Sequence, residues 1–584
     1  MDKKKMLPYG VSNFEAVRQE NYYYVDKTGY LRDLEEYKYV LFLRPRRFGK
    51  SLFLNMLRTY YDINCKDKFE TLFGGLAIGE KPTELRNKYM MLSFNFSIVA
   101  SLPSKVQDSF NEVVLEQIGH FVMRYGELLP AGTREYVTGG GVDCAVALSR
   151  IVSVVGNAGY KIYVTIDEYD NFANTLMSID EASYQRILHA DGFVRYFYNV
   201  LKAMTTENGA GVDRIFITGV SPLCLSDVTS GFNIAYNLSM ESRFNGMVGF
   251  YTSEVREMLA YYAASITPAP KDTEGALTLM KSYYDNYCFC EEAAEAGEHL
   301  FNSDMTLYFI SKYVDKKGAA PRNMLDDNVK QDFNKIRMML RYEKKFGSKA
   351  HKMQSILNNG YTLAPINSQF QILELTSADN FISLLFYLGL LTYGRVNLRG
   401  REVVLPVVAN EAMREQYGNY LSTSYGDALE WRADTDVMND LWANWAYLGE
   451  WRPMIEYIAS VMHDNDSVRD YGPEGEQFVK GFMLAHLCNG NGYIARTEAE
   501  MGHGYSDIYL YPTNPDYRHA LVVEIKYLKP TATDGEVEAK VEEGKAQVGR
   551  YVEEKRLRED AEMRGWSLDA VVLVFRGWKV ERVE

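Results

Sequence analysis

Hydrophobic positions in the first 250 residues gather into short apolar runs separated by amphipathic segments, which is the pattern of a parallel α/β sheet. The runs are rich in Val, Ile, Tyr and Phe and are bounded by polar or turn residues. They are KYVLFL (38–43), YMMLSFNF (89–96), KIYVTI (161–166) and RIFITGV (214–220). Because they are apolar almost throughout rather than alternating, we expect strands covered by helices on both faces.

The pattern becomes mostly helical over 251–420. This middle part contains the charged stretch NVKQDFNKIRMMLRYEKKF (328–346), which we expect to be helical. It closes with an apolar helix and two strand-like runs around Arg399 and Gly400. A helix followed by a hairpin is typical of a winged-helix element, and a helical region that only packs over the first unit fits the same pattern.

A second α/β pattern follows a tryptophan-rich connector. Between 421 and 470, tryptophans recur at helical spacing and predict a pair of core helices; they are Trp431, Trp442, Trp445 and Trp451. From 471 onward the expected order is helix, two strands, helix and strand. The segments are GEQFVKGFMLAHL, SDIYLYP, ALVVEIKYL, KAQVGRYVEEKRLRED and AVVLVFRG.

Composition narrows the class of protein. The chain has 584 residues, of which 47% are hydrophobic and 24% charged, as in globular proteins with several domains. Its six cysteines include one close pair, Cys288 and Cys290, and lack the two nearby pairs of a zinc site, so we expect reduced thiols. The net charge of -14 argues against broad nonspecific adhesion to nucleic acid.

Membrane and export signals are not evident in the sequence. No apolar run reaches the ~18 residues that a membrane-spanning helix needs. The N-terminal MDKKKMLPYGVSNF lacks the apolar stretch of a signal peptide. We therefore expect a cytoplasmic protein without a membrane partner.

The segment VLFLRPRRFGKSLFLNML (40–57) runs from a strand through a basic loop into an apolar helix. Gly49, Lys50 and Ser51 match the end of the phosphate-loop pattern G-x-x-x-x-G-K-[ST], although Arg44 stands where that pattern has glycine. In such loops backbone N–H groups and the helix N-terminus face phosphates, the lysine reaches the outer phosphates and the hydroxyl binds Mg²⁺. The sequence therefore predicts a site for ATP and Mg²⁺. Its phosphate-binding residues are Arg46, Arg47, Phe48, Gly49, Lys50, Ser51 and Leu52.

Two later strands end in polar residues that fit this site. KIYVTIDEYDNF carries Asp167, which can hold the water shell of Mg²⁺, and Glu168, which can polarise an attacking water. An ordinary strand-end cap is the alternative for this pair. RIFITGVSP carries Thr218 and Ser221, which fit either a sensor of the γ-phosphate or simple turn chemistry.

Cations also gather around the loop and could serve the phosphates of a nucleotide or of a polynucleotide. This basic cluster comprises Arg44, Arg46, Arg47, Lys50 and Arg58. Farther along the chain, Arg243 in ESRFNGM could act in trans as an arginine finger in a homo-oligomer, although a salt bridge is the more ordinary role.

The last unit carries acids and a lysine suited to phosphodiester cleavage, which needs an activated water and neutralised phosphate charge. Glu524 and Lys526 project on the same side of a strand because strand side chains alternate. Sixteen residues (508–523) separate Asp507 from Glu524, enough for a hairpin that brings the two carboxylates together around Mg²⁺. A solvated cross-strand charge pair is the alternative, but the apolar ALVV before Glu524 indicates a buried strand.

Neighbouring helices offer further members of this second site. Glu476 lies on the preceding helix and could bind the metal or relay to it. Gln547 and Tyr551 are four residues apart and share one face of the helix that follows.

These motifs carry two family resemblances. LPYGVSNFEAVRQENYYYVDKTGYLRDLEE followed by LFLRPRRFGKSLFLNML resembles the bacterial AAA-ATPase-like family, whose hallmark is an R-P-R-R-F-G-K-S loop. TIDEYDN, ITGVSPLCLSDVTSGFNIAYNLS and GFYTSEV match further parts of it in order. TEAEMGHGYSDIYLYP and ALVVEIKYLKP resemble the PD-(D/E)XK nuclease-like domain, with Asp507, Glu524 and Lys526 as its acid, acid and lysine.

The resemblances imply an α/β multidomain protein. Residues 1–250 would be an AAA-like P-loop NTPase domain with a parallel sheet, 251–420 a helical or winged-helix-like middle, and 421–584 connector helices with a PD-(D/E)XK nuclease-like α/β domain. The predicted function is an ATP-binding protein, hydrolysing ATP, coupled to a Mg²⁺-dependent nuclease that acts on DNA or RNA. The alternatives are a nucleotide-switched module that binds nucleic acid or protein through an inactive nuclease fold, and an ATPase whose terminal domain mediates assembly.

Overall fold

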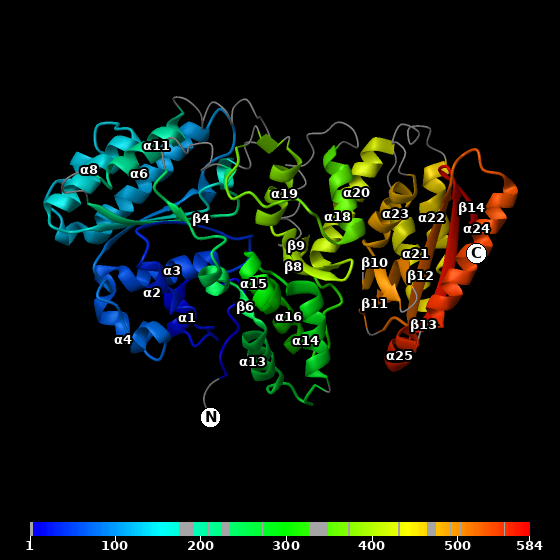
Figure 1. The fold of residues 1–584 in the computed structure, drawn as a ribbon. Helices are drawn as coiled ribbons and strands as arrows, with labels where there is room; N and C mark the ends of the chain where they lie inside the picture. The colour runs from blue at the N-terminus through cyan, green and yellow to red at the C-terminus, as the bar shows by residue number, and fades with distance from the viewer. Residues whose placement is uncertain are drawn as a thin grey trace.

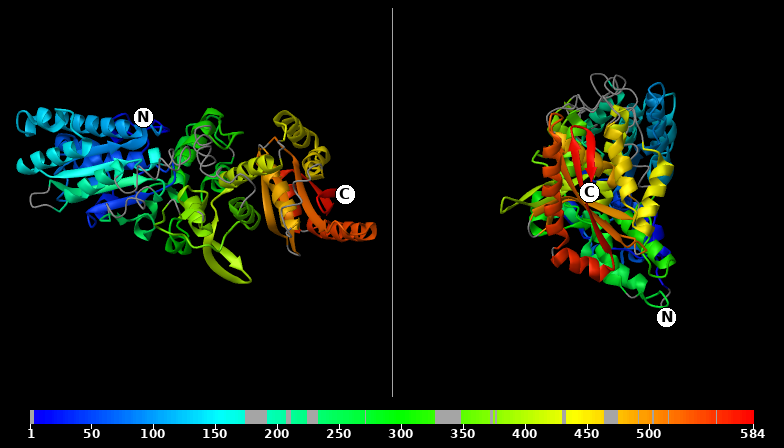
Figure 2. Two further views of the ribbon diagram at one scale, coloured as in Figure 1. Left: turned by 90° about the horizontal axis from the view of Figure 1, so that it is seen from above. Right: turned by 90° about the vertical axis from the view of Figure 1, so that its right-hand side faces the viewer.

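The structure is a computed structural model. It describes residues 4–173, 192–206, 211–223, 233–270, 272–326, 348–371, 374–375, 377–429, 433–463, 475–490, 492–501, 504–514, 516–553 and 555–584. Figures 1 and 2 show an elongated molecule, with the N-terminal unit (blue and cyan) at one end and the C-terminal unit (orange and red) at the other. Helices of the middle region (green) lie between them. Among the described residues no helix combines the length and the apolar character that a membrane crossing requires.

The N-terminal unit is built on a parallel sheet with the strand order β2-β3-β4-β1-β5. Its strands are β1 (Tyr39–Leu43), β2 (Met90–Asn95), β3 (Ile162–Asp167), β4 (Val212–Gly219) and β5 (Tyr236–Asn237). The four strands predicted from the apolar runs, and their parallel arrangement, are confirmed.

Helices cover both faces of this sheet, as near-continuous apolar strands require. Three of the longer helices lie together on one side, and the helices from the start of the chain lie on the other (Figure 1). The first group is α6 (Val106–Tyr125), α8 (Cys144–Asn157) and α11 (Phe193–Ala203). The second is α1 (Phe14–Gln19), α2 (Tyr30–Leu34), α3 (Lys50–Tyr61) and α4 (Phe69–Phe73).

The middle region is mostly helical and closes with the expected helix and hairpin. Strands β8 (Leu391–Leu398) and β9 (Arg401–Val408) pair antiparallel, and the turn places Arg399 and Gly400 at positive φ angles of 51° and 82°. The charged stretch 328–346 and Trp431 lie outside the described residues. The helices are α13 (Thr252–Ala263), α14 (Thr273–Tyr284), α15 (Glu291–Ala296), α16 (Ser303–Asp315), α18 (Ser348–Asn359) and α19 (Ala378–Tyr387), with β6 (Phe250–Tyr251) pairing β7 (Leu300–Phe301).

The C-terminal unit has a mixed sheet of order β10-β11-β12-β13-β14, in which only β12 and β13 pair in parallel. Its strands are β10 (Tyr493–Met501), β11 (Gly504–Pro512), β12 (His519–Leu528), β13 (Ser567–Arg576) and β14 (Lys579–Val583). The helices are α20 (Glu411–Leu429), α21 (Thr435–Leu448), α22 (Arg452–His463), α23 (Gly475–Leu487), α24 (Asp534–Val552) and α25 (Lys555–Arg564). The helix pair predicted within 421–470 is present as α21 and α22.

Successive side chains along each strand point to opposite faces of this sheet. Val523 and Ile525 belong to the large core that also contains Phe478 of α23. Val522 lies on the opposite face and packs with Tyr551 of α24. Glu524 and Lys526 share the parity of Val522, so they lie on the α24 side.

Candidate nucleotide and metal sites

The phosphate-loop segment joins β1 to α3 through two residues in left-handed conformation. Arg47 has a φ of 69° and Gly49 a φ of 94°, and helix α3 begins directly after Gly49. Arg44 is not among the residues with positive φ. The loop therefore has no need of glycine at position 44, because its sharp turns fall three and five residues later.

Arg44 is a structural cation. Its guanidinium is buried and donates to the carbonyl oxygens of Leu43 (2.9 Å), Ser239 (2.6 Å) and Phe244 (3.1 Å). It also lies 4.0 Å from the ring centroid of Phe289. Burial lowers the pKa of Arg44 to about 9. Arg44 thus ties the end of β1 to the chain after β5.

The predicted basic cluster is wrong as a single patch, because two of its members point into the protein. Besides Arg44, Arg58 is largely enclosed and its Nε donates to Thr165 Oγ1 at 2.8 Å. Burial lowers the pKa of Arg58 to about 10. The cations left at the loop are Arg46, Arg47 and Lys50.

Gly249 and two residues at the start of α16, in the middle region, hold the carbonyl groups of the loop. The Phe48 carbonyl accepts from Gly249 N (3.0 Å) and from Ser303 Oγ (3.0 Å) at the start of α16. The Arg47 carbonyl accepts from Asp304 N at 3.1 Å. These contacts join the phosphate loop directly to the helical middle.

Lys50 lies inside the loop, close to the acids that end β3. Its ammonium donates to the carbonyls of Arg44 and Pro45, both at 2.9 Å. Burial lowers the pKa of Lys50 to about 8, although the charges of Asp167 and Glu168 oppose that shift. Burial also raises the pKa of Glu168, against the charges of Arg46 and Lys50. The two β3 acids and the loop lysine therefore share one electrostatic environment.

A cavity of about 470 Å³ opens beside the loop. Its walls also include Tyr24 and Lys27 from the N-terminal segment, Glu168 after β3 and Leu307 of α16, whereas the buried Asp167 is not part of them. Its size lies within the ~300–1,000 Å³ of most ligand and cofactor pockets. The predicted loop residues all line it: Arg46, Arg47, Phe48, Gly49, Lys50, Ser51 and Leu52.

Three further candidates do not line this cavity. The Thr218 hydroxyl is buried and donates to the carbonyl of Phe42 on β1 at 2.8 Å. This hydrogen bond is made inside the sheet and does not face the cavity. Ser221 is also fully buried. Arg243 forms ion pairs with Asp33 and Glu36, each at 2.6 Å, so the ordinary salt-bridge role is the one observed.

The second set of candidates meets where β11 and β12 diverge. The antiparallel ladder ends with Ile508 opposite Val523, and one further step in that register sets Asp507 opposite Glu524. Opposite residues of an antiparallel pair project on the same side of the sheet. The Asp507 carboxylate accepts the Ile525 N–H at 2.7 Å, so it takes the place of the next backbone acceptor.

Lysines balance the charge of these acids. Lys526 Nζ lies 3.0 Å from Glu524 Oε1 and 3.4 Å from Glu543 Oε1. Lys480 Nζ of α23 lies 3.3 Å from Asp507 Oδ1. Burial acts to lower the pKa of Lys526, but the hydrogen bonds and charges of Glu524 and Glu543 together outweigh it and the pKa is raised. The pKa of Glu524 is raised by burial first and by Asp507 second.

The chemistry of the donors fits Mg²⁺. Glu524 Oε2 is buried, and among the described residues nothing hydrogen-bonds to it. Carboxylate oxygens are the ligands that Mg²⁺ prefers, and one or two of them commonly suffice alongside substrate phosphates. Glu476, by contrast, is exposed, and the described part of the chain contains no group of three acids, histidines or cysteines placed to hold a metal.

Helix α24 packs over the face of the sheet that carries Glu524 and Lys526. Gln547 Oε1 is buried and has no hydrogen-bond partner among the described residues, and Tyr551 is buried nearby. Burial raises the pKa of Tyr551, and the charge of Glu524 adds to the shift. The sequence interpretation missed Glu543 and Lys480. Helical spacing was the available signal, since Glu543 is four residues before Gln547 and Lys480 four after Glu476.

Comparison with known proteins agrees with this geometry. Residues 8–229 match the family described as predicted AAA-ATPase, and residues 474–584 match the PD-(D/E)XK nuclease superfamily. The chain joins an AAA-ATPase-like domain to a PD-(D/E)XK nuclease superfamily domain. Both resemblances predicted from the sequence are therefore confirmed.

One curated relative and several solved structures are similar to parts of the chain. The relative is an uncharacterized protein in the vnfD 5′ region of Azotobacter chroococcum mcd 1, 27% identical over 299 residues; this chain spans about half (50%) of its length, and the match covers 50% of this chain. Aeropyrum pernix ORC2 in ADPNP-ADP complexes gives 11% identity and a TM-score of 0.32 over 70% of this chain and 98% of that one. Aeropyrum pernix ORC1 in complex with DNA gives 12% identity and a TM-score of 0.28, over 70% of this chain and 96% of that one. Scores this low do not establish a shared fold.

Proposed function

We propose that the protein binds and hydrolyses ATP and that its nucleotide state controls a Mg²⁺-dependent nuclease acting on DNA or RNA. The observation that carries the nuclease half is the juxtaposition of Asp507 and Glu524 across β11 and β12, with Lys526 bonded to Glu524. The family match of residues 474–584 supports the same reading.

In the nuclease half, Asp507 and Glu524 are the residues that would hold Mg²⁺. The ion would supply Lewis acidity and a more acidic bound water. Lys526 keeps its positive charge beside them, where it can orient water or stabilise charge that develops on the phosphate. Gln547 and Tyr551 present polar groups from α24 above the acids. Glu476 would join as a further ligand only if the side chain turned inward.

In the nucleotide half, Lys50 would contact the outer phosphates and the Ser51 hydroxyl would complete the Mg²⁺ shell with Asp167. Glu168 lines the same cavity, which supports the proposal that it polarises the attacking water. The bonds from Gly249 and Ser303 to the Phe48 carbonyl supply a path by which a change in the loop reaches the helical middle.

The test is a cleavage assay of the purified protein on labelled DNA and RNA, with and without ATP and Mg²⁺. Lys526→Ala is expected to abolish cleavage and to leave ATP binding intact, while Lys50→Ala is expected to abolish ATP binding. Lys540→Ala is a matched control, because Lys540 also pairs with Glu543 but is more exposed. Equal cleavage by Lys526→Ala would refute the nuclease assignment.

A second function has its own supporting observation. The side chains of Glu524 and Lys526 are only 5% and 12% exposed, and Lys480 already pairs with Asp507. Charges balanced within the chain also suit a nuclease fold that only binds nucleic acid or a protein under nucleotide control. Metal-dependent product formation distinguishes the two functions.

A further inference from the structure

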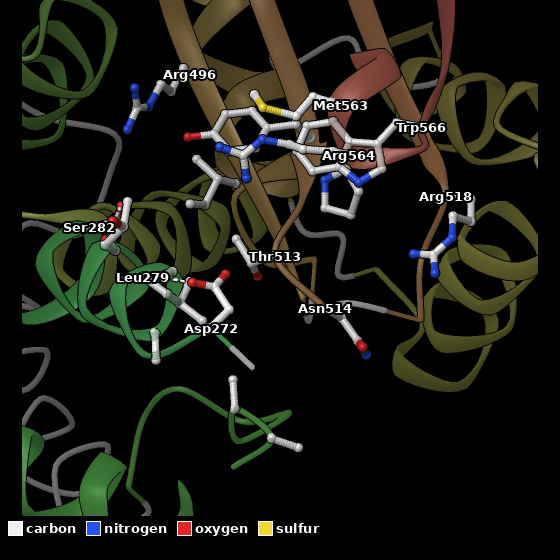
Figure 3. A pocket seen from close by; sticks show the side chains of 18 of the residues that line it. Asp272, Leu279, Ser282, Arg496, Thr513, Asn514, Arg518, Met563, Arg564 and Trp566 are labelled. Atoms are coloured by element: carbon white, nitrogen blue, oxygen red, sulfur yellow. Dashed lines mark hydrogen bonds between the residues drawn. The ribbon is translucent and has the colours of Figure 1, made fainter. Parts of the chain in front are cut away.

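A large cleft separates the helical middle from the nuclease-superfamily domain. Its volume is about 1520 Å³. One wall is α14 with residues 318–320, and the other is formed by β10, β11 and α25. Figure 3 shows Asp272, Leu279 and Ser282 on the first wall facing Arg496 and the α25 end across the opening.

The domain-side wall combines aromatic rings with arginines. Tyr511 and Trp566 stack with their ring centroids 5.9 Å apart and their planes 27° from parallel. The Arg564 guanidinium lies 5.0 Å from the Trp566 centroid, and that of Arg496 lies 5.6 Å from the Tyr511 centroid. Arg564 and Trp566 lie next to each other in Figure 3; Arg564 is exposed and Trp566 half-buried.

Charged side chains of both signs line the cleft. Arg496, Arg518 and Arg564 line it, together with the acids Asp272 and Glu559. Arg496 also forms an ion pair with Glu411, with Nε 3.3 Å from Oε1. Asp272 caps α14 by accepting the Gly275 N–H at 2.6 Å and keeps its negative charge at this wall. The three arginines on the domain-side wall offer local cationic groups to an anionic ligand, within a chain of net charge -14.

The cleft and the candidate metal site share one face of the sheet. Asp507, Tyr509 and Tyr511 alternate onto the same side of β11. Four residues of strand span about 14 Å, so the stacked rings lie a short distance from the acids. Tyr509, packed with Tyr551 and Leu557, separates the two sites.

We propose that this cleft binds single-stranded nucleic acid, with phosphates on Arg496, Arg518 and Arg564 and bases on the rings of Tyr511 and Trp566. The inference rests on the proposed action on nucleic acid and names where the strand is held. The volume exceeds the ~300–1,000 Å³ of most small-molecule pockets, which favours a polymer. Ring faces combined with cations bind strands whose bases are unpaired and accept any base sequence.

The experiment measures binding of labelled single-stranded DNA, single-stranded RNA and duplex DNA to the full chain by fluorescence anisotropy, with EDTA present to prevent cleavage. Single strands should bind more tightly than the duplex. Trp566→Ala should weaken single-strand binding about 5- to 100-fold. Arg564→Glu should weaken it without removing the ring. Arg564→Ala should make the slope of log affinity against log salt concentration shallower, by about 0.7 for each phosphate that the arginine neutralises.

The control is Arg452→Ala, since Arg452 also lies over a tryptophan, 5.3 Å from the Trp451 centroid, on a helix that does not line the cleft. It should leave binding unchanged. Wild-type binding by both Trp566→Ala and Arg564→Glu, or preferential binding of duplex, would overturn the inference. If those variants lose binding while the wild type shows no cleavage, the cleft assignment stands and the proposed nuclease reaction fails.

Discussion

Lys50 and Lys526 are the lysines of the two candidate sites, and their surroundings shift their pKa values in opposite directions. The ammonium of Lys50 donates to two neutral carbonyls, those of Arg44 and Pro45. That of Lys526 lies between the carboxylates of Glu524 and Glu543. Burial lowers the pKa of Lys50 to about 8, whereas Glu524 and Glu543 together outweigh burial at Lys526 and raise its pKa.

The difference shows what each site lacks. Carbonyl dipoles satisfy hydrogen bonds but do not neutralise a charge, so the nucleotide site favours an added anion such as phosphate. The nuclease-domain site is already neutralised by its own lysines, so an added cation must compete with Lys526 or Lys480. Under the proposed function, a phosphate would complete the first site, and the second would have to rearrange to accept a cation.

The largest expected effect concerns the site of Asp507, Glu524 and Lys526. Glu524→Gln removes a carboxylate from the proposed metal site, and cleavage should fall to background because the ion that activates water would lose a ligand. Thermal stability should not fall, because the substitution also removes a buried charge. Cleavage rates and the melting temperature check both statements. Undiminished cleavage would show that Glu524 serves only the fold.

Arg44→Gly restores the common phosphate-loop glycine and tests whether this arginine belongs to the nucleotide site at all. We expect a loss of about 3 kcal/mol in the free energy of unfolding, because the carbonyls of Ser239 and Phe244 would lose a buried charged donor. Denaturant unfolding followed by fluorescence measures it. Arg47→Ala, at an exposed neighbour, should change stability by no more than about 0.5 kcal/mol. Equal losses for the two variants would contradict the structural role.

The lowered pKa of Lys50 predicts proton uptake on nucleotide binding. Above a pH of about 8 the free lysine is largely neutral, and anionic phosphates favour its charged form. ATP affinity should therefore fall with rising pH above that value, by up to about tenfold per pH unit. Calorimetry in buffers of different protonation enthalpy counts the protons. The same uptake in Lys50→Ala would assign the proton to another group.

The lowered pKa of Lys50 also determines how the free energy of unfolding changes with pH. The unfolded chain holds this proton up to the ordinary lysine pKa of 10.5, so between about 8 and 10.5 it binds more protons than the folded chain. The Lys50 contribution to the free energy of unfolding should therefore rise with pH in that window.

The smallest expected effect concerns the link between the loop and the middle region. Ser303→Ala removes the bond to the Phe48 carbonyl but leaves that from Gly249, so a change of about 1 kcal/mol is expected. It should appear as an altered ATP affinity and a weaker ATP dependence of cleavage. Thr306→Ala is a control, since that hydroxyl bonds within α16 to the Asn302 carbonyl. Equal effects of both variants would point to helix stability instead of coupling.

Much of each site could be predicted from local patterns. Strand alternation placed Glu524 and Lys526 on one side, and the segment lengths predicted the hairpin that sets Asp507 opposite. Helical spacing predicted the shared face of Gln547 and Tyr551, and would also have identified Glu543. These relations depend on backbone geometry over a few residues, which the sequence alone specifies.

The tertiary structure decided which polar groups meet across long sequence separations. The sequence determined that Arg44, Arg58 and Thr218 stand beside phosphate-loop motifs, but segments such as 239–245 determined that Arg44 turns inward. The same holds for the pairing of Lys480 with Asp507, the contact of Ser303 with Phe48 and the cleft that brings α14 to face Trp566. The physical reason is that a charged side chain can be buried only where carbonyl groups or opposite charges lie close to it. Those partners belong to elements far away in the sequence, and local sequence patterns do not predict how such elements are arranged.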